Sequence, residues 1–268
     1  MSVTELDQFP HSWAIRTYPE IAEVAESDGS ILVLPVGSLE QHGHHLPVAT
    51  DTILVTEVVN VGVDRVTDDV PVLTLPPIWA GFSPHHVDFG GTVTVSFDRL
   101  HRYVEDVVSS ATAYGFDAVL IVNGHGGNNA LVSTAVNTIG VSHPDLEVLG
   151  VTYFALAATF IDEIRESSTG GMAHGGEFET SLMLHFRPDL VRTDALSSTV
   201  REEPYDHAGR EMFDGGPLSV YRPFSHYTDV GVLGEPELAS AEKGAAISDL
   251  LGDELEHVLR QVHGEVRS

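Results

Sequence analysis

The sequence contains no cysteine. Disulfide bonds, thiolate metal ligands and cysteine nucleophiles are therefore all excluded. Long apolar runs are also missing, because the longest candidates, residues 31–36 and 151–161, fall short of the roughly 20 residues that a membrane-spanning helix needs. Residues 1–5 lack the basic and then apolar character of a secretion signal. We expect a cytoplasmic protein with no membrane partner.

Basic residues are scarce as well. The 268 residues include 40 Asp and Glu but only 13 Lys and Arg, which gives a formal net charge of −27, and Lys243 is the single lysine. This charge argues against nucleic acid or an anionic membrane as a partner, because both are also negative. The acids are dispersed along the chain, which favours a halophilic protein adapted to molar salt, where screening is strong. An acidic surface for a basic partner is the alternative.

Strand-like and helix-like segments alternate along the chain, a pattern typical of an α/β domain with a largely parallel central sheet. With 42% hydrophobic residues and no linker or repeat, we predict one domain over residues 1–268. Residues 193–235 are rich in Gly, Pro and Asp and are expected to form a long excursion or an oligomer arm. Strands are predicted over 31–36, 71–75, 92–95, 118–122 and 147–153, and helices over 98–114, from about 129, over 177–186 and over 240–262.

The first cluster of polar residues follows the apolar run 31–36, where ligands of open α/β sheets bind. Glu40 and His42 alternate in an extended segment and so project together, and Asp51 follows at the start of a helix. Two carboxylates and an imidazole form a ligand set suited to zinc, manganese or iron(II). The alternative is that Asp51 only caps its helix and that the histidine is solvated.

The second cluster is the glycine-rich turn 123–129, between an apolar run and a helix. Glycines let backbone N–H groups approach a ligand, and the helix N-terminus favours negative charge. The turn lacks the sequence of a P-loop or of a dinucleotide fingerprint, so nucleotide binding is only weakly supported. His125 at its centre is better interpreted as a metal ligand, with the neighbouring amides as donors to an oxyanion.

The third cluster is residues 172–181. His174 precedes the predicted helix and is suited to proton transfer near neutral pH. Glu177 and Glu179 stand two residues apart on that helix, about 200° around its axis, so they cannot both face one small site. One of them is therefore expected to be functional and the other to be an acid favoured at the helix N-terminus.

These motifs together resemble the creatininase (creatinine amidohydrolase) family: residues 35–43 with Asp51, then 123–128, then 174–181, with a matching segment at 81–92. The resemblance implies a three-layer αβα sandwich, assembled as a homo-oligomer, commonly a hexamer. It also implies a hydrolase of C–N bonds in small amides, formamides or cyclic amides that uses one or two divalent ions per subunit. Zinc is expected first, with manganese or iron(II) as alternatives.

Carried over residue by residue, the resemblance assigns roles to nine positions. Two departures bear on them: creatininase has a glutamate where this chain has Gly127, and tryptophans that close its site, whereas only Trp13 and Trp79 are present here. In creatininase that glutamate serves the second metal and the attacking water, so with Gly127 the second ion is expected to be weaker, absent or held by Glu179 alone. The missing tryptophans make creatinine doubtful as the substrate, and a formamidopyrimidine or a short peptide is considered beside it. The metal ligands are expected to be Glu40, His42, Asp51, His125 and Glu179, the proton donor His174, and the substrate contacts Ser83, Gly126 and Gly127.

The expected reaction is attack of a metal-activated water on an amide carbon, with His174 protonating the leaving nitrogen. The alternative is a non-catalytic, metal-stabilised binding or assembly protein of the same family. A phosphate or nucleotide binder is a third possibility. The stretch 221–227 is aromatic-rich and is a candidate to reach the site of a neighbouring subunit.

Overall fold

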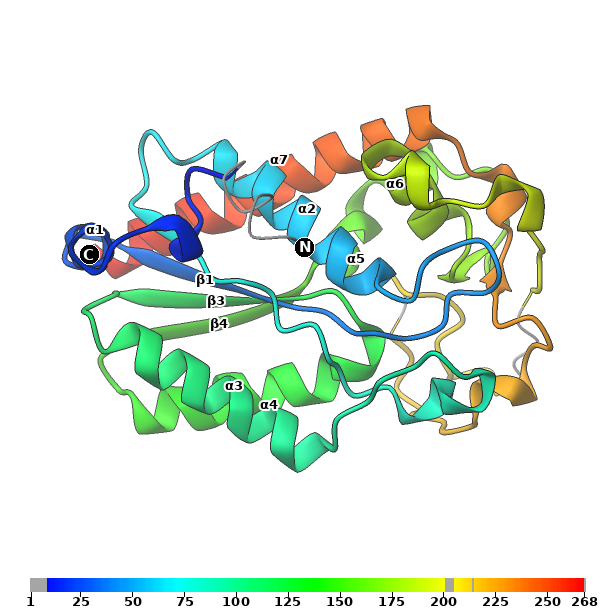
Figure 1. The fold of residues 1–268 in the computed structure, drawn as a ribbon, viewed down its shortest axis with the longest axis horizontal. Helices are drawn as coiled ribbons and strands as arrows, with labels where there is room; N and C mark the ends of the chain where they lie inside the picture. Colours follow the sequence, from blue (N-terminus) through cyan, green and yellow to red (C-terminus); the bar gives the residue numbers. More distant parts are fainter. Residues whose placement is uncertain (1–8, 201–204, 214, 268) are drawn as a thin grey trace.

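A four-stranded parallel sheet forms the middle layer of the computed structural model, which describes residues 9–200, 205–213 and 215–267. β1 and β3 pair in register over their whole length, from Ile31 opposite Ala118 to Val36 opposite Asn123. All strands therefore end at the same edge of the sheet (Figure 1). In the order β2-β1-β3-β4, the strands are β2 (Val72–Thr74), β1 (Ile31–Val36), β3 (Ala118–Asn123) and β4 (Glu147–Thr152).

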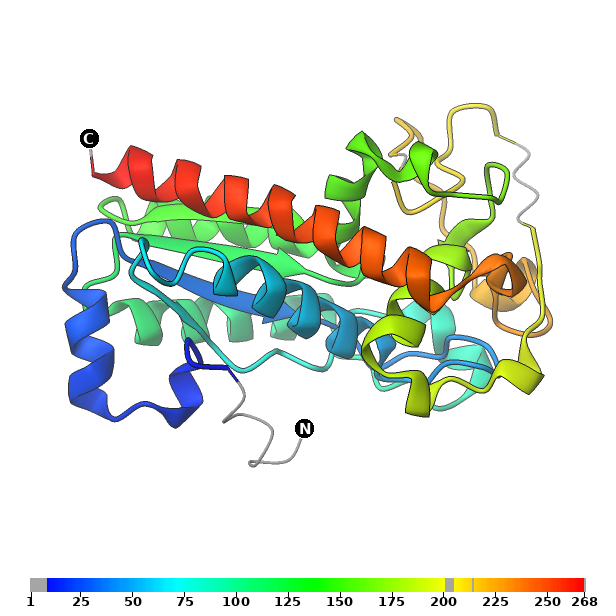
Figure 2. The ribbon, with the colours of Figure 1, turned by 90° about the horizontal axis from the view of Figure 1, so that it is seen from above.

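Helices cover both faces of this sheet. α2 (Thr50–Asp64) and α7 (Ala241–Val266) pack together on one face, and α3 (Phe97–Thr112) and α4 (Asn129–Ser142) on the other (Figure 1). Figure 2 shows α7 running along the length of the sheet. The three-layer αβα arrangement predicted from the sequence is thus confirmed, with a parallel central sheet.

The core consists of one apolar cluster on each face of the sheet. Ile31 and Val33 pack with the buried residues of α2 and α7, whereas Leu32 and Leu34 pack with those of α3 and α4. Successive side chains of a strand point to opposite faces, so a strand covered on both sides must be apolar throughout. This explains why the buried strands read as uninterrupted apolar runs in the sequence.

The remaining elements lie around this sandwich. They are α1 (Tyr18–Ala25), α5 (Tyr153–Leu156) and α6 (Glu177–Phe186), together with the antiparallel pair β5 (Met172–His174) and β6 (Leu233–Gly234). α6 has the bounds that the sequence predicts. No helix among the described residues is long and apolar enough to span a membrane. The absence of a secretion signal at residues 1–5 and the single domain over 1–268 involve residues outside the described ranges and stay predictions.

The described part of residues 193–235 is an irregular excursion, with short 3₁₀ turns and β6 as its regular structure. It lies at the end of the molecule where the parallel strands end (Figures 1 and 2). A contribution of this segment to an oligomer interface stays a prediction.

One local prediction is wrong, and so is the alternative that Asp51 only caps its helix. Residues 92–95 form no strand, because Val93 makes only an isolated bridge with Leu39 and the hydroxyls of Thr92 and Thr94 bond the backbone N–H groups of Gln41 and Ser83 instead. Asp51 does not cap its helix. α2 begins one residue earlier, at Thr50, and the Asp51 carboxylate is turned toward two histidines.

Candidate metal centre

The predicted metal ligands gather beyond the carboxyl ends of β1 and β3. Glu40 and His42 lie in the loop after β1, and His125 lies in the turn after β3. Asp51 comes from the first turn of α2 and Glu179 from the first turn of α6. All five side chains are buried. Segments far apart in the chain thus form one cluster, in which overlapping groups of ligand atoms lie within 4.8 Å of one another.

The first group consists of Glu40, Asp51 and His125. His125 Nδ1 lies 3.1 Å from Glu40 Oε2 and 3.1 Å from Asp51 Oδ2. On the other side of the ring, His125 Nε2 lies 3.2 Å from the Phe82 carbonyl oxygen and 3.0 Å from Ser83 Oγ. A carbonyl oxygen can only accept, so we assign the proton to Nε2. In the neutral ring, this tautomer directs the Nδ1 lone pair at the space between the two carboxylates, where a cation would bind.

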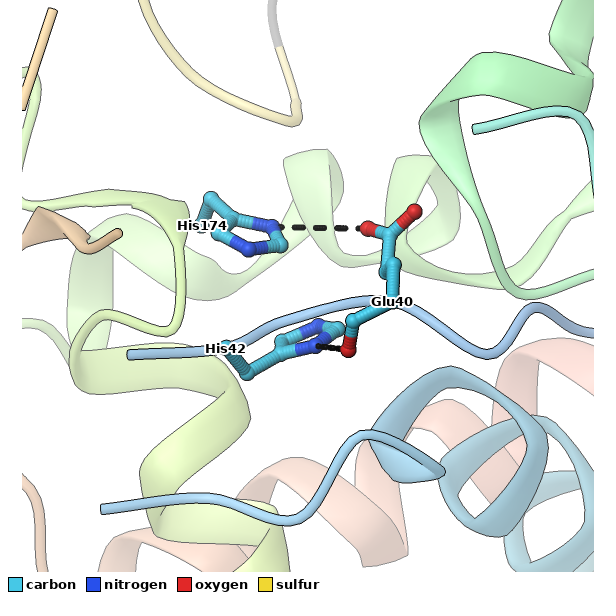
Figure 3. A group of neighbouring side chains, drawn as sticks. All are labelled: Glu40, His42 and His174. Carbon is cyan, nitrogen blue, oxygen red and sulfur yellow. Dashed lines mark hydrogen bonds and ion pairs between the residues drawn. The ribbon is translucent and has the colours of Figure 1, made fainter. Parts of the chain in front are cut away.

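The second group consists of His42, Asp51 and Glu179. The His42 Nδ1–H donates to the Glu40 carbonyl oxygen at 3.1 Å (Figure 3), which leaves the Nε2 lone pair facing the group. Nε2 lies 3.1 Å from Asp51 Oδ1 and 3.6 Å from Glu179 Oε1. The two oxygens of Asp51 therefore face different groups, so this carboxylate is shared between them.

Opposite charges are concentrated in the cluster. Burial disfavours a charged imidazole, but the Glu40 and Asp51 carboxylates raise the pKa of His125 to about 10. Burial is likewise outweighed at His42, where Asp51 and Glu179 raise the pKa well above its usual value. Against its own burial, Asp51 has a lowered pKa because both imidazoles stabilise its carboxylate. A cation bound here would replace these protons, so its affinity is expected to fall at low pH.

The cluster fits a divalent ion by a further observation. Three of its buried atoms lack a hydrogen bond within the described part of the chain: Glu40 Oε2, His42 Nε2 and Asp51 Oδ2. Buried polar atoms are normally satisfied, and an unsatisfied one is costly. Carboxylate oxygens and neutral imidazole nitrogens are the ligands of zinc, manganese and iron. An ion in the first group would satisfy Glu40 Oε2 and Asp51 Oδ2, and an ion in the second group would satisfy His42 Nε2.

His174 lies beside the cluster at the end of β5. Its Nε2–H donates to the Gln41 carbonyl oxygen at 2.7 Å, so the Nδ1 lone pair points toward Glu40 Oε1, 3.7 Å away (Figure 3). The ring also packs on His42, with the centroids 4.2 Å apart. Burial, with the repulsion of nearby imidazoles, lowers the pKa of His174 well below its usual value. His174 is therefore neutral at neutral pH and presents a proton acceptor to the site.

The two acids of α6 face different surroundings, as their spacing on the helix predicts. Gly175 N–H donates to Glu179 Oε2 at 2.6 Å, which holds the other oxygen toward His42. Glu177 is buried on another side of the helix, where it forms an ion pair with Lys243. The single lysine of the chain thus balances the acid that does not face the cluster.

Two residues were not singled out from the sequence. Gln41 lies between Glu40 and His42 in the sequence. Its side-chain Nε2–H donates to His86 Nδ1 at 2.9 Å. The ring of Phe224 packs on His86 and His174, with centroids 4.2 and 4.7 Å away. Only the position of Gln41 between two predicted ligands was a signal for it. Phe224 lies in the stretch 221–227, and the aromatic-rich composition of that stretch was the signal for it.

A cavity of about 710 Å³ opens onto the cluster. Its lining includes Gly126 and Gly127, as expected of substrate contacts, whereas Ser83 is fully buried and orients His125 from behind. Neither Trp13 nor Trp79 is among the lining residues, and aromatic walls come instead from segments after β4 and in the excursion. These are Phe154, Phe213, Tyr221, Phe224 and Tyr227.

Comparisons with known proteins agree with this site. The family model described as creatinine amidohydrolase matches residues 14–259. The chain belongs to the creatininase family. It is accordingly a hydrolase of C–N bonds. The mycofactocin precursor peptide peptidase of Mycobacterium ulcerans is 31% identical over 93% of this chain and 95% of its own length, and the creatinine amidohydrolase of Pseudomonas putida is 28% identical over 90% and 92%.

Solved structures of the family superpose on this chain. A creatininase variant described as the Zn-Zn type is 26% identical, with a TM-score of 0.79 over 93% of this chain and 97% of the other. This family member therefore shares its fold with creatininase and carries groups of candidate metal ligands.

Proposed function

We propose that this chain is a divalent-metal-dependent amidohydrolase whose substrate is a short peptide or an amide of similar size. The observation that carries the metal dependence is the shared Asp51, whose two oxygens face two separate groups of buried ligand atoms. One ion would be held by Glu40, Asp51 and His125 and a second by His42, Asp51 and Glu179. Both groups are complete although Gly127 stands where creatininase has a glutamate. We therefore propose two ions, with zinc first and manganese or iron(II) as alternatives.

The size of the cavity supports the substrate class. A volume of about 710 Å³ lies within the range of roughly 300–1,000 Å³ typical of sites for drug-sized ligands. A single small ring such as creatinine would leave much of this space to water. The absence of tryptophan from the lining removes the walls that close the creatininase site, and the mycofactocin precursor relative is named a peptide peptidase. A short peptide fits these observations better than creatinine or a formamidopyrimidine.

Ions bound at the centre would lower the pKa of a bound water toward about 7 and polarise the amide carbonyl. His174 is neutral and directs Nδ1 at the centre, so it can accept a proton from the attacking water. The water oxygen bonds to the amide carbon, the C–N bond breaks, and His174 passes the proton to the leaving nitrogen. Backbone amides of Gly126 and Gly127 are available to stabilise the oxyanion.

The alternatives have less support. A purely structural metal site is closed by protein ligands, whereas a large cavity opens onto this one. A phosphate or nucleotide at the turn 123–129 would face the carboxylates of Glu40 and Asp51 beside His125, which would repel it unless ions were bound. Assembly as a homo-oligomer, a hexamer by resemblance, stays a prediction that light scattering can check.

The test is elemental analysis of the purified protein combined with a hydrolysis screen of acetylated dipeptides, formamidopyrimidines and creatinine. We expect bound divalent metal and hydrolysis of the dipeptides, lost with a chelator and restored by metal. His174→Gln should keep the metal but lower kcat by about 10²–10⁴-fold. His143→Gln is the matched control, since His143 bonds Ser109 outside the site, and it should keep full activity. Metal-free protein whose hydrolysis survives chelation would refute the proposal.

A further inference from the structure

The cavity is lined by positively charged side chains as well as by the acidic cluster. Arg210 and Arg222 line it together with Glu40 and Asp51. In a chain with a net charge of −27, acids are plentiful, and several arginines pair with them, as Arg260 does with Glu256 and Asp69. Arg222 is the cavity arginine whose contacts bear on what the cavity binds.

Among the described residues, Arg222 is held by aromatic rings. Its guanidinium carbon lies 5.5 Å from the centroid of the Tyr205 ring and 5.7 Å from that of Tyr227, and one of its N–H groups donates to His226 Nε2 at 3.2 Å. No carboxylate among the described residues forms an ion pair with it. A guanidinium stacked on aromatic faces keeps donors at its edge free for a planar anion. Bidentate binding of a carboxylate uses this edge.

The segments that carry both arginines are fixed in place. Glu211, next to Arg210, accepts two hydrogen bonds from Arg165, at 2.8 and 2.6 Å, and one from Gly170 N–H. Phe224, two residues after Arg222, is packed on His86 and His174 beside the metal centre. Arg222 is thus pre-organised at a fixed position relative to the reacting groups, which lowers the entropy cost of binding.

We infer that the substrate carries an anionic group, a carboxylate in the first place, which Arg222 binds with help from Arg210 while the scissile amide lies at the metal centre. This inference rests on the proposed function and narrows its substrate class to anionic amides, such as a peptide with a free C-terminal carboxylate. It also assigns the aromatic-rich stretch 221–227 to the cavity of its own chain.

The test compares probes that differ only in this charge. Binding of 3-phenylpropionate and of its neutral amide to the metal-loaded full chain is measured by calorimetry at one fixed salt concentration. Hydrolysis of N-acetyl dipeptides is measured with a free carboxylate and with a C-terminal amide. We expect wild type to prefer the acid, and Arg222→Met to lower affinity and kcat/KM for the acid about 10- to 100-fold with little change for the amide.

Two further variants make the result specific. Arg222→Lys keeps the charge but loses the planar fork, so it should retain part of the preference. Arg260→Gln removes the same charge from an ion pair on α7 and should leave both probes unchanged. The inference is wrong if wild type binds acid and amide alike, or if the preference survives in Arg222→Met with its metal content intact. Acid-selective binding that depends on Arg222, without hydrolysis of any dipeptide, would refute the proposed function and leave the anion site standing.

Discussion

Substituting Asp51 should remove both ions, whereas substituting Glu179 should remove one. Asp51 directs one oxygen at His42 and the other at His125, so Asp51→Asn deprives each group of a charged ligand. Glu179 belongs only to the group with His42 and Asp51, and Glu179→Gln leaves the ligands Glu40, Asp51 and His125 in place. The comparison of the two variants distinguishes a carboxylate that serves both groups from a carboxylate that serves one. In both variants a carboxylate is replaced by its amide.

The size of the expected change in Tm follows from the linkage between metal binding and folding. At a free metal concentration of about 100 times Kd, one ion adds about 2.7 kcal/mol to stability, so two ions add about 5 kcal/mol. At about 2 °C per kcal/mol, added metal should raise the Tm of wild type by about 10 °C, that of Glu179→Gln by about 5 °C, and that of Asp51→Asn hardly at all.

The assay is thermal unfolding followed by circular dichroism, in chelator and in metal, with elemental analysis of each sample. Wild type in chelator is the reference for each shift. Full metal content and a full shift in Asp51→Asn would refute the shared role of Asp51. Equal losses in Asp51→Asn and Glu179→Gln would show that the two groups bind a single ion.

Three other predictions concern Gly127, the Lys243–Glu177 pair and the net charge of the chain. A Cβ at position 127 would collide with His125 Nε2 and the Phe82 carbonyl, so Gly127→Ala should cost about 1–3 kcal/mol in chemical denaturation and lower the metal content. Lys243→Met removes the cation that pairs with the buried Glu177 carboxylate, so it should lower the free energy of unfolding by about 3–5 kcal/mol near pH 7. Hydrogen bonds from Lys243 and Ser167 lower the Glu177 pKa against its burial, so this stabilisation is present above the ordinary value of 4.5 and is lost as pH falls below it. The difference between wild type and variant should therefore shrink in melts at acid pH. Finally, dilution from molar to millimolar salt should lower Tm through repulsion within a net charge of −27, and an unchanged Tm would exclude the halophilic interpretation.

Much of the sandwich could be predicted from the sequence because buried parallel strands and amphipathic helices leave local patterns. β1, β3 and α6 follow the predicted ranges closely, and the ligand-bearing loops follow predicted strands. The prediction of a strand over residues 92–95 is wrong because threonine and valine alternate there as they would in a strand. The same alternation occurs here in a loop, where the threonine hydroxyls accept hydrogen bonds from backbone N–H groups of other loops. The local sequence does not show which distant group a hydroxyl will bond.

The sequence by itself determined which residue types could bind a metal and that Glu177 and Glu179 must diverge, because helical geometry fixes that angle. The residue pattern alone left open which of the two acids faces the site; the resemblance to creatininase pointed to Glu179, and the tertiary structure turns Glu179 toward His42 and the two oxygens of Asp51 toward different groups. It also decided that His174 presents Nδ1 and that Arg222 reaches the cavity from an irregular segment. Each of these depends on distances between atoms far apart in the chain, and those distances are set by the packing of helices on the sheet.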